Sequence, residues 1–469
     1  MTPIAPFRVE CDLQDCEIEG RVPPDVRGAF YRVGPDCQYP PRAPTIPFDG
    51  EGHVSMFRIA DGHVDYRSRF VRTQRFKAQQ AARRSLFGAY RNPFTDDPAV
   101  AGLSRGTANT HVVYHNGKLL ALKEDSPPVL MDPRTLQTLD DCHTFSGRLK
   151  SLTFTAHPKL DRDTGEMIAF GHEAAGLASD DVSVFTVDRA GNLSWEAWIK
   201  VPYAGLLHDF AVTERHIAFL VIPMATNLQQ MQRGGVHFAW DSTLPTWLGV
   251  MRRGGDGKDL RWFRGPERCA THIMGAFSDG ERMYMDMQMS LKHPFPFLPN
   301  LHGEPFDPAA ACGRITRLSV DLANRNSDAY EMEVMYPHVG YLPRQDDRYN
   351  TFPYRYGFMN VSDMSQPPPA GRAGFRRTTC YVRFDHQTRT TSTFTAQGDC
   401  TLSEPCFVPR SERASEGDGY LIGISDGLHP GGHTELLILD AQHLEDGTIA
   451  KVKLPFRTNL HVHGSWVPD

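Results

Sequence analysis

Four of the chain's 20 histidines lie at the edges of apolar, strand-like segments: His157, His208, His272 and His463. The first three are spaced by roughly 50 to 65 residues, about one blade of a β-propeller, and the last interval would span several blades. Imidazoles at the axial ends of inner propeller strands could meet at one Fe, Cu, Zn or Ni ion and leave room for a small ligand. Taken alone, each is more simply explained as a hydrogen-bonded core or surface histidine.

A second group of polar residues ends an otherwise apolar strand in the sequence LLALKED. Lys123 could hold a phenolate or carboxylate there, and Glu124 could orient a metal-binding histidine. The simpler interpretation of both residues is a solvated strand end. Tyr90, in the sequence GAYRNPFTDDP, is likewise compatible with a site residue or with a packed loop aromatic.

The signatures of several other enzyme classes are absent from the sequence. There is no GxSxG elbow, Walker loop, HExxH or helix-opening GxGxxG. A net charge of −6 argues against a nucleic-acid partner, which would need a basic face. The first residues show no secretory signal, and no apolar run approaches the ~18 residues of a spanning helix. With nine cysteines and no CxxC pair, we expect a cytoplasmic protein without stable membrane insertion.

Most of the chain has the pattern of short strands joined by tight turns, as 40 glycines and 35 prolines among 469 residues suggest. Hairpins are predicted around Asp61-Gly62, Asn116-Gly117, Gly191 and Asp279-Gly280, and over 419–441. Helical patterns are confined to 76–86 and 227–233, and the Pro-rich stretch 366–370 is expected to be a loop. Hairpins repeated without a linker favour one all-β domain over residues 1–469, an irregular β-propeller or a large sandwich.

Motifs spread over nearly the whole chain resemble the carotenoid cleavage oxygenases, a family that includes the bacterial lignostilbene dioxygenases. They include GAFYRVG from Gly28, FDGEG from Phe48, HVVYHNGKLLALKED from His111, LLHDF from Leu206, THIMGAF from Thr271 and HGSW from His463. The resemblance implies a seven-bladed β-propeller with a cap of loops and short helices over an axial metal site. It also implies a mononuclear Fe(II) cofactor on the four histidines singled out above.

The resemblance extends to residues that would support the metal ligands. Glu124 and Glu404 match glutamates that hydrogen-bond the outer nitrogens of ligand histidines, which fixes the rings and raises their basicity. A third glutamate of the family usually precedes a Leu/Phe-Pro-Arg element. Here Tyr341 precedes Leu342-Pro343-Arg344, so the resemblance assigns no third glutamate.

The stilbene-cleaving branch of the family resembles this chain at Phe48, Tyr90 and Lys123. This implies O2-dependent cleavage of the central C=C bond of 4-hydroxystilbenes to two phenolic aldehydes, with carotenoid or apocarotenoid cleavage as the alternative. A carotenoid offers no acidic group to pair with a buried lysine. Tyr90 and Lys123 could instead bind a phenol oxygen and favour phenolate, which pushes electron density onto the C=C bond, while Phe48 flanks the ring.

The segment LKHPFPFLPNL admits three interpretations. Phe295 and Phe297 could line the substrate pocket, contribute to an apolar membrane patch, or belong to a packed Pro-rich loop. A small aromatic substrate needs no membrane dock, so the pocket is preferred over the patch.

Two further hypotheses come from other protein classes. A propeller that serves only as a binding platform would hold no stoichiometric metal. A propeller hydrolase of the lactonase kind would use Ca2+ held by carboxylates and asparagine. For the oxygenase, the expected partners are a small aromatic substrate and O2, without nucleic acid, and a homodimer is the default expectation for the oligomeric state.

Overall fold

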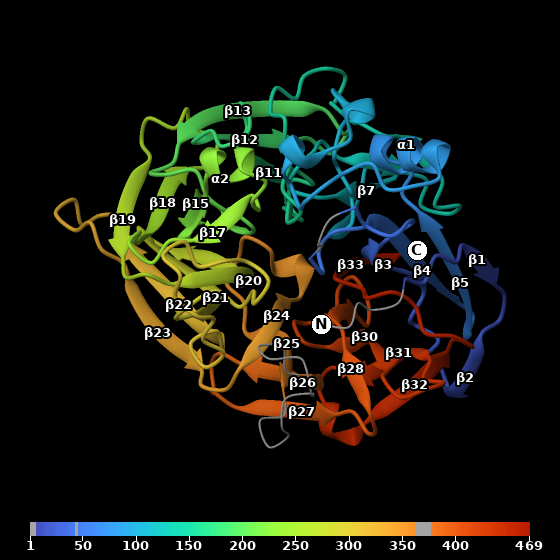
Figure 1. The fold of residues 1–469 in the computed structure, drawn as a ribbon. Helices are drawn as coiled ribbons and strands as arrows, with labels where there is room; N and C mark the ends of the chain where they lie inside the picture. Colours follow the sequence, from blue (N-terminus) through green and yellow to red (C-terminus); the bar gives the residue numbers. More distant parts are fainter. Residues whose placement is uncertain (1–5, 43–45, 363–376) are drawn as a thin grey trace.

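The computed structural model describes residues 6–42, 46–362 and 377–469; the Pro-rich stretch 366–370 lies outside them. Within the described residues, seven antiparallel sheets surround a common axis, with a small two-stranded sheet added (Figure 1). The pattern of hairpins in the sequence was compatible with either a propeller or a large sandwich, and the family resemblance implied seven blades. The structure confirms the seven-bladed β-propeller.

Two of the blades combine strands from distant parts of the chain. One has the order β1(Cys11–Leu13), β5(His63–Phe70), β4(Glu51–Ala60), β3(Gly28–Asp36) and β33(His463–Pro468). The other has the order β2(Glu17–Gly20), β32(Thr448–Lys453), β31(Thr434–Asp440), β30(Gly419–Gly427) and β28(Cys400–Leu402), with β29(Cys406–Pro409) also on β30. Because early and late strands pair in both sheets, backbone hydrogen bonds close the ring.

In each of the other blades, four strands follow one another outward from the axis. They are β6(His111–His115), β7(Lys118–Leu122), β8(Val129–Met131) and β9(Thr138–Asp140); β10(Lys159–Leu160), β11(Met167–His172), β12(Asp181–Val187) and β13(Leu193–Lys200); β14(Phe210–Val212), β15(His216–Val221), β18(Thr246–Arg252) and β19(Arg261–Gly265); β20(Cys269–Asp279), β21(Arg282–Ser290), β22(Arg314–Asp321) and β23(Glu331–Tyr336); and β24(Gly340–Gln345), β25(Tyr356–Ser362), β26(Thr378–Asp385) and β27(Thr391–Thr395). The small sheet of β16(Met224–Thr226) and β17(Phe238–Trp240) is inserted between β15 and β18. In Figure 1, β20 and β24 lie near the axis, whereas β19, β23 and β27 lie at the rim.

The predicted hairpin turns occur where the sequence placed them. Asp61 and Gly62 have φ values of 54° and 85°, and Asn116 and Gly117 have values of 45° and 72°. A two-residue primed turn needs positive φ at both central positions, which Asp-Gly and Asn-Gly provide at low cost. These turns join β4 to β5 and β6 to β7.

Helices are short and lie in the connections between strands. The helix predicted over 76–86 is observed as α1(Gln74–Ala82), which Thr73 caps and which ends where Arg83 adopts a left-handed conformation. The second predicted helix, over 227–233, is observed as α2(Leu228–Gln232), which Asn227 caps. The single-turn helices are η1(Pro93–Thr95), η2(Pro98–Val100), η3(Asp347–Tyr349) and η4(Leu444–Asp446). Among the described helices, none combines the length and the apolar character needed to cross a membrane.

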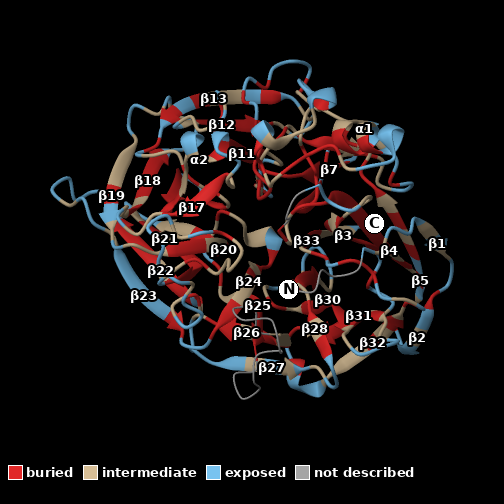
Figure 2. Ribbon diagram, viewed as in Figure 1, coloured by how far each residue is buried: buried red, intermediate tan, exposed pale blue. Residues whose placement is uncertain are grey.

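The hydrophobic core is divided into layers that lie between adjacent blades. Phe170 of β11, for example, packs edge-on against Phe210 of β14 and Phe219 of β15, with ring centroids 4.9 and 5.7 Å apart. Figure 2 shows burial concentrated inside the ring and exposure at its rim. The inner strands are therefore held on both sides, and the residues at their ends have fixed positions near the axis.

Candidate metal centre

The four histidines nominated from the sequence converge at one point near the axis. His157 and His208 each stand two residues before an innermost strand, β10 and β14, while His272 lies within β20 and His463 opens β33. Their ligand nitrogens all lie within 4.8 Å of one another. The Nε2 atoms are 3.1 Å apart between His157 and His208, 3.0 Å between His208 and His272, and 3.2 Å between His272 and His463.

These separations match the geometry of a metal site. Nitrogen ligands ~2.1 Å from one ion and at right angles to each other are ~3.0 Å apart. Four neutral imidazoles form a donor set suited to a transition metal, whereas Ca2+ takes oxygen ligands. The residues present therefore fit a metal of the iron, copper or zinc type and do not fit the calcium site of a lactonase.

A break in the β20–β21 pairing aims His272 at this point. Ala270 pairs with Met289 and Ile273 with Met287, so two residues of β20 lie opposite Gln288 alone. The extra residue of such a bulge disrupts the alternation of side chains and turns one of them out of the regular pattern. The Thr271 hydroxyl donates to Gln288 Oε1 at 2.9 Å, which leaves His272 to face the axis.

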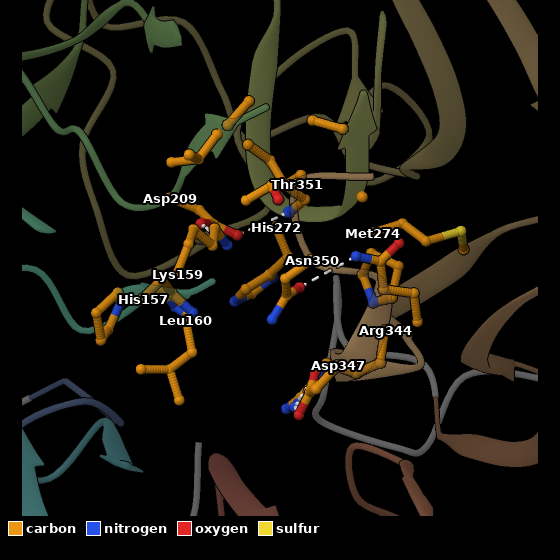
Figure 3. A pocket seen from close by; sticks show the side chains of 18 of the residues that line it. His157, Lys159, Leu160, Asp209, His272, Met274, Arg344, Asp347, Asn350 and Thr351 are labelled. Atoms are coloured by element: carbon orange, nitrogen blue, oxygen red, sulfur yellow. Dashed lines mark hydrogen bonds and ion pairs between the residues drawn. The ribbon is translucent and has the colours of Figure 1, made fainter. Parts of the chain in front are cut away.

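Asp209 sets the spacing between two of the ligands, a role that the sequence analysis did not identify. One carboxylate oxygen accepts from the Lys159 ammonium at 2.7 Å and from the main-chain N–H of Phe210 at 2.8 Å. The other accepts from the main-chain N–H of Ile273 at 2.8 Å. A residue adjacent to His208 is thereby tied to the residue that follows His272 (Figure 3).

Glu124 holds the outer nitrogen of His208. Its Oε1 lies 2.5 Å from His208 Nδ1, and its side chain is buried. Burial opposes ionisation of this carboxyl, but His208, Lys123 and Arg91 outweigh it, so the pKa lies well below the usual 4.5. An ionised Glu124 accepts the Nδ1 proton and leaves Nε2 free to bind a metal.

Glu404 performs the same task for His463 and is itself held by two arginines. Its Oε1 lies 2.8 Å from His463 Nδ1, while Oε2 accepts from Arg32 and Arg344, each at 3.2 Å. Arg32 also donates to the main-chain oxygen of Val462. Burial opposes ionisation of Glu404, but His463 and the arginines hold its pKa well below 4.5. Arg32 and Arg344 lie in motifs that carry the family resemblance, but those motifs did not indicate that the two arginines contact Glu404.

The third outer nitrogen, Nδ1 of His272, is buried without a hydrogen-bond partner among the described residues. No glutamate was assigned to it from the sequence, because Tyr341 occupies the position where the family usually has one. The lack of a partner for this nitrogen agrees with the presence of Tyr341 in place of the glutamate that the family usually has. The tetrad is thus supported by two glutamates rather than three.

His111 also lies beside the tetrad, although the sequence analysis did not single it out. Its ring centroid is 5.6 Å from that of His157 and 5.5 Å from that of His463. Its two nitrogens face the main-chain oxygens of Ala156 and Gly464, at 2.8 and 3.3 Å. Both nitrogens are directed at main-chain oxygens and not at the point where the tetrad converges, so His111 lines the centre without joining the donor set.

The surroundings favour the unprotonated form of three of the ligand imidazoles, those of His157, His272 and His463. Burial, followed by the neighbouring histidines, lowers the pKa of both His157 and His272 well below the usual 6.5. Burial also lowers that of His463, although Glu404 opposes the effect. Neutral imidazole is the form that binds a metal, so the centre is ready to accept one near neutral pH.

A small cavity of about 100 Å³ extends from the histidines between the inner strands (Figure 3). Its walls combine two ligands with charged and amide side chains: His157, His272, Lys159, Asp209, Arg344, Asp347 and Asn350. Arg344 donates to Asp347 at 2.9 Å, and Lys159 pairs with Asp209. Apolar side chains such as Leu160, Val212 and Met274 complete the walls.

Lys123 and Tyr90 are brought together by the fold, as their proposed role in binding a phenol requires. The Lys123 Nζ lies 5.3 Å from the centroid of the Tyr90 ring. Lys123 is 5% exposed, and although burial opposes its charge, Tyr90, Glu124 and Asp125 raise its pKa. Burial also raises the pKa of Tyr90. The pair therefore offers a buried cation and a protonated hydroxyl at neutral pH.

The three phenylalanines nominated for the substrate pocket form one cluster. The Phe48 ring meets Phe295 and Phe297 edge-on, with centroids 5.6 and 5.3 Å away. Phe295, Phe297 and Tyr90 all pack against the same hydrophobic core. The main chain at Phe48 is anchored by Asn109, whose Nδ2 donates to the Phe48 carbonyl at 2.9 Å. The rings of Phe295 and Phe297 thus face inward, although Leu291, in the same segment 291–301, is 54% exposed.

The fold and the centre together define a β-propeller with a candidate metal site formed by histidines from four blades. The family model described as retinal pigment epithelial membrane protein matches residues 4–468. The chain belongs to this family, that of the carotenoid cleavage oxygenases. This confirms the family to which the sequence motifs pointed.

Individual relatives match over nearly the full length. The chain is 42% identical to lignostilbene-alpha,beta-dioxygenase isozyme III of Sphingomonas paucimobilis, covering 99% of this chain and 95% of that protein. It is 40% identical to an isoeugenol monooxygenase of Pseudomonas putida, covering 98% and 96%. The crystal structure of Pseudomonas brassicacearum lignostilbene dioxygenase superposes with a TM-score of 0.95 at 39% identity, covering 99% of this chain and 97% of the other.

Proposed function

We propose that this protein is an Fe(II)-dependent dioxygenase that cleaves the central C=C bond of 4-hydroxystilbenes to two phenolic aldehydes. The observation that carries the proposal is the buried Lys123 ammonium against the Tyr90 ring, next in sequence to the glutamate that holds His208. Similarity over the full length to a lignostilbene dioxygenase and an isoeugenol monooxygenase supports it.

The pair Lys123 and Tyr90 would bind the phenol oxygen of the substrate. Tyr90 donates a hydrogen bond, and the Lys123 charge favours loss of the phenol proton. Phenolate pushes electron density through the ring onto the conjugated C=C bond and prepares that bond for attack by O2. Phe48, Phe295 and Phe297 supply apolar walls for the aryl group.

The metal ligands in this proposal are His157, His208, His272 and His463. Iron bound there would supply the activation of O2 that the cleavage needs. Glu124 and Glu404 accept the Nδ1 protons of two ligand rings and keep the Nε2 atoms directed at the ion.

Carotenoid or apocarotenoid cleavage by the same centre is the alternative. It would place the uncharged chain of a polyene against the Lys123 ammonium, which excludes water from the cation without offering it a new partner and is therefore costly. The oxygen of a phenol can pair with Lys123, so the same lysine would then contribute to substrate binding. Isoeugenol, a phenol with a conjugated propenyl chain, shares that feature with the 4-hydroxystilbenes, so both are tested.

The decisive experiment loads the protein with Fe(II) without O2 and then admits air in the presence of a substrate. The substrates are 4-hydroxystilbene, its 4-methoxy ether, isoeugenol and an apocarotenal, and the aldehyde products are identified by mass spectrometry. We expect rapid cleavage of 4-hydroxystilbene and slow cleavage of the ether. Preference for the apocarotenal would overturn the substrate assignment, and cleavage without O2 would overturn the oxygenase assignment.

We further propose that residues 1–469 act as one oxygenase domain. Closure of the ring by pairing of β2 with β32 and of β3 with β33 supports this, because removing either end would open a blade. The homodimer expected by default is tested by sedimentation, in which a species of 52.6 kDa would contradict it.

A further inference from the structure

A buried charged cluster lies directly behind Tyr90. The next residue, Arg91, is buried, and its Nη2 lies 3.5 Å from Oε2 of Glu173, which follows β11. His237 Nε2 lies 2.8 Å from the same carboxylate oxygen. The side chains of Arg91, Glu173 and His237 are only 5%, 4% and 1% exposed. Burial of so many ionisable groups is costly unless each has its partners.

His237 connects this carboxylate to the main chain beside Tyr90. Its Nδ1 lies 3.0 Å from the Arg91 carbonyl oxygen, and its Nε2 lies 2.8 Å from Oε2 of Glu173. Both ring nitrogens therefore face oxygen atoms of other residues, and the ring has one preferred orientation. The peptide that follows Arg91 is thereby tied to the end of β11.

Asn92 provides a second anchor for the same loop. This fully buried side chain donates to the main-chain oxygens of Met231 and Gly235, at 2.8 and 2.5 Å. Met231 belongs to α2, and Gly235 lies in the connection from α2 to β17 that also carries His237. The backbone on the C-terminal side of Tyr90 is thus held at two successive residues.

The cluster also balances charge near the phenol-binding pair. Arg91 and Lys123 are both buried cations close enough to Tyr90 to influence its ionisation. Glu173 neutralises Arg91, so Lys123 is left as the cation that faces the Tyr90 ring. Burial opposes the charge of Glu173, but His237, Arg91 and His172 lower its pKa to about 2, so it is ionised at neutral pH.

We propose that Glu173 and His237 are positioning residues for phenol recognition, acting through the main chain at Arg91 and through the charge of its side chain. They fix the backbone that presents Tyr90, and they keep Arg91 from competing with Lys123 for the substrate oxygen. This inference rests on the proposed function, because it assumes that Tyr90 and Lys123 bind a phenol.

The test compares the binding of 4-hydroxystilbene with that of its 4-methoxy ether by iron-loaded protein kept free of O2. The ratio of the two dissociation constants reports recognition of the hydroxyl group and is not changed by a general loss of active protein. Glu173→Gln removes the balancing charge, and we expect the preference for the hydroxyl compound to fall about tenfold. His237→Gln adds no unpaired charge, and we expect a fall of about fivefold.

The matched control is Asp286→Asn. Asp286 is fully buried and pairs with Arg317 at 2.8 Å, but it lies in the β20–β23 blade and has no contact with Tyr90 or its loop. We expect this variant to be less stable and to keep the wild-type preference. A preference unchanged in both Glu173→Gln and His237→Gln would overturn the inference and leave the proposed function standing. Wild-type protein that binds both compounds alike would overturn the proposed function itself.

Discussion

Glu124 Oε1 lies 2.5 Å from Nδ1 of His208, while the preceding residue, Lys123, is directed toward the ring of Tyr90. These two successive residues follow the end of β7, where the chain turns, and their side chains reach different partners. One supports a metal ligand and the other reaches the proposed phenol site. Substitutions at these two positions are therefore expected to separate metal binding from substrate recognition.

Glu124→Gln is expected to weaken iron binding by about 10-fold to 100-fold, the usual effect of removing a carboxylate behind a ligand histidine. The amide keeps the shape of the side chain but loses the charge that makes His208 more basic. Competition with a chelator measures the affinity. Glu166→Gln, at a partly exposed glutamate that pairs with Arg253, serves as the control. Equal affinities in the two variants would contradict the role assigned to Glu124.

Lys123→Met is expected to lower kcat/KM for 4-hydroxystilbene by at least about 100-fold while leaving the iron content unchanged. The substitution removes the cation that favours phenolate but keeps much of the apolar stem of the side chain. Lys118→Met, at the exposed first residue of β7, is the control. Unchanged turnover in Lys123→Met would remove the main argument for a phenolic substrate.

Local sequence patterns were sufficient to predict the hairpins and the positions of the four histidines. Asp61-Gly62 and Asn116-Gly117 specify their turns through backbone preferences that do not depend on the rest of the fold. The four histidines lie at the edges of strands, and the apolar composition and alternating pattern of those strands can be recognised in the sequence. Seven blades and the identity of the ligands, however, came from the family resemblance, since spacing alone selects no unique set among 20 histidines.

The partners that hold the ligands could not be predicted in this way, because they come from distant segments. Arg32 and Glu404 are 372 residues apart in the sequence, and neither has a local pattern that marks it as a partner of the other. Asp209 shows its role only when β14 and β20 are placed side by side. The bulge that turns His272 inward is likewise a property of two paired strands.

His208→Ala is expected to abolish stoichiometric iron binding and with it the cleavage activity. His208 lies centrally in the tetrad, with its Nε2 3.1 Å from that of His157 and 3.0 Å from that of His272. His111→Gln is the informative comparison, because His111 is adjacent to the tetrad but has both nitrogens directed at main-chain oxygens. Metal analysis of the two variants should show iron lost from the first and retained by the second. Full iron in His208→Ala would refute the proposed donor set.

Asp426 is expected to make the protein less stable as the pH rises from about 4 to about 6. This residue of β30 accepts a hydrogen bond from Thr434, yet burial raises its pKa from an ordinary 3.8 to about 6. Below the ordinary value the carboxyl is protonated in both states and costs nothing. Between the two values the unfolded chain releases the proton while the folded chain retains it, so folding becomes less favourable, and above pH 6 the penalty is constant.

Asp426→Asn removes this penalty while keeping an oxygen that can accept from Thr434. We expect the free energy of unfolding to rise by about 3 kcal/mol at pH 7, as a pKa displacement of this size implies, and to change little at pH 4. Urea unfolding at both pH values measures the difference. Asp385→Asn provides the opposite case, because Arg355 and main-chain N–H groups overcome burial and lower the pKa of Asp385 to about 2, so that variant should be less stable at pH 7. An equal gain for Asp426→Asn at both pH values would show that its carboxyl does not titrate as described.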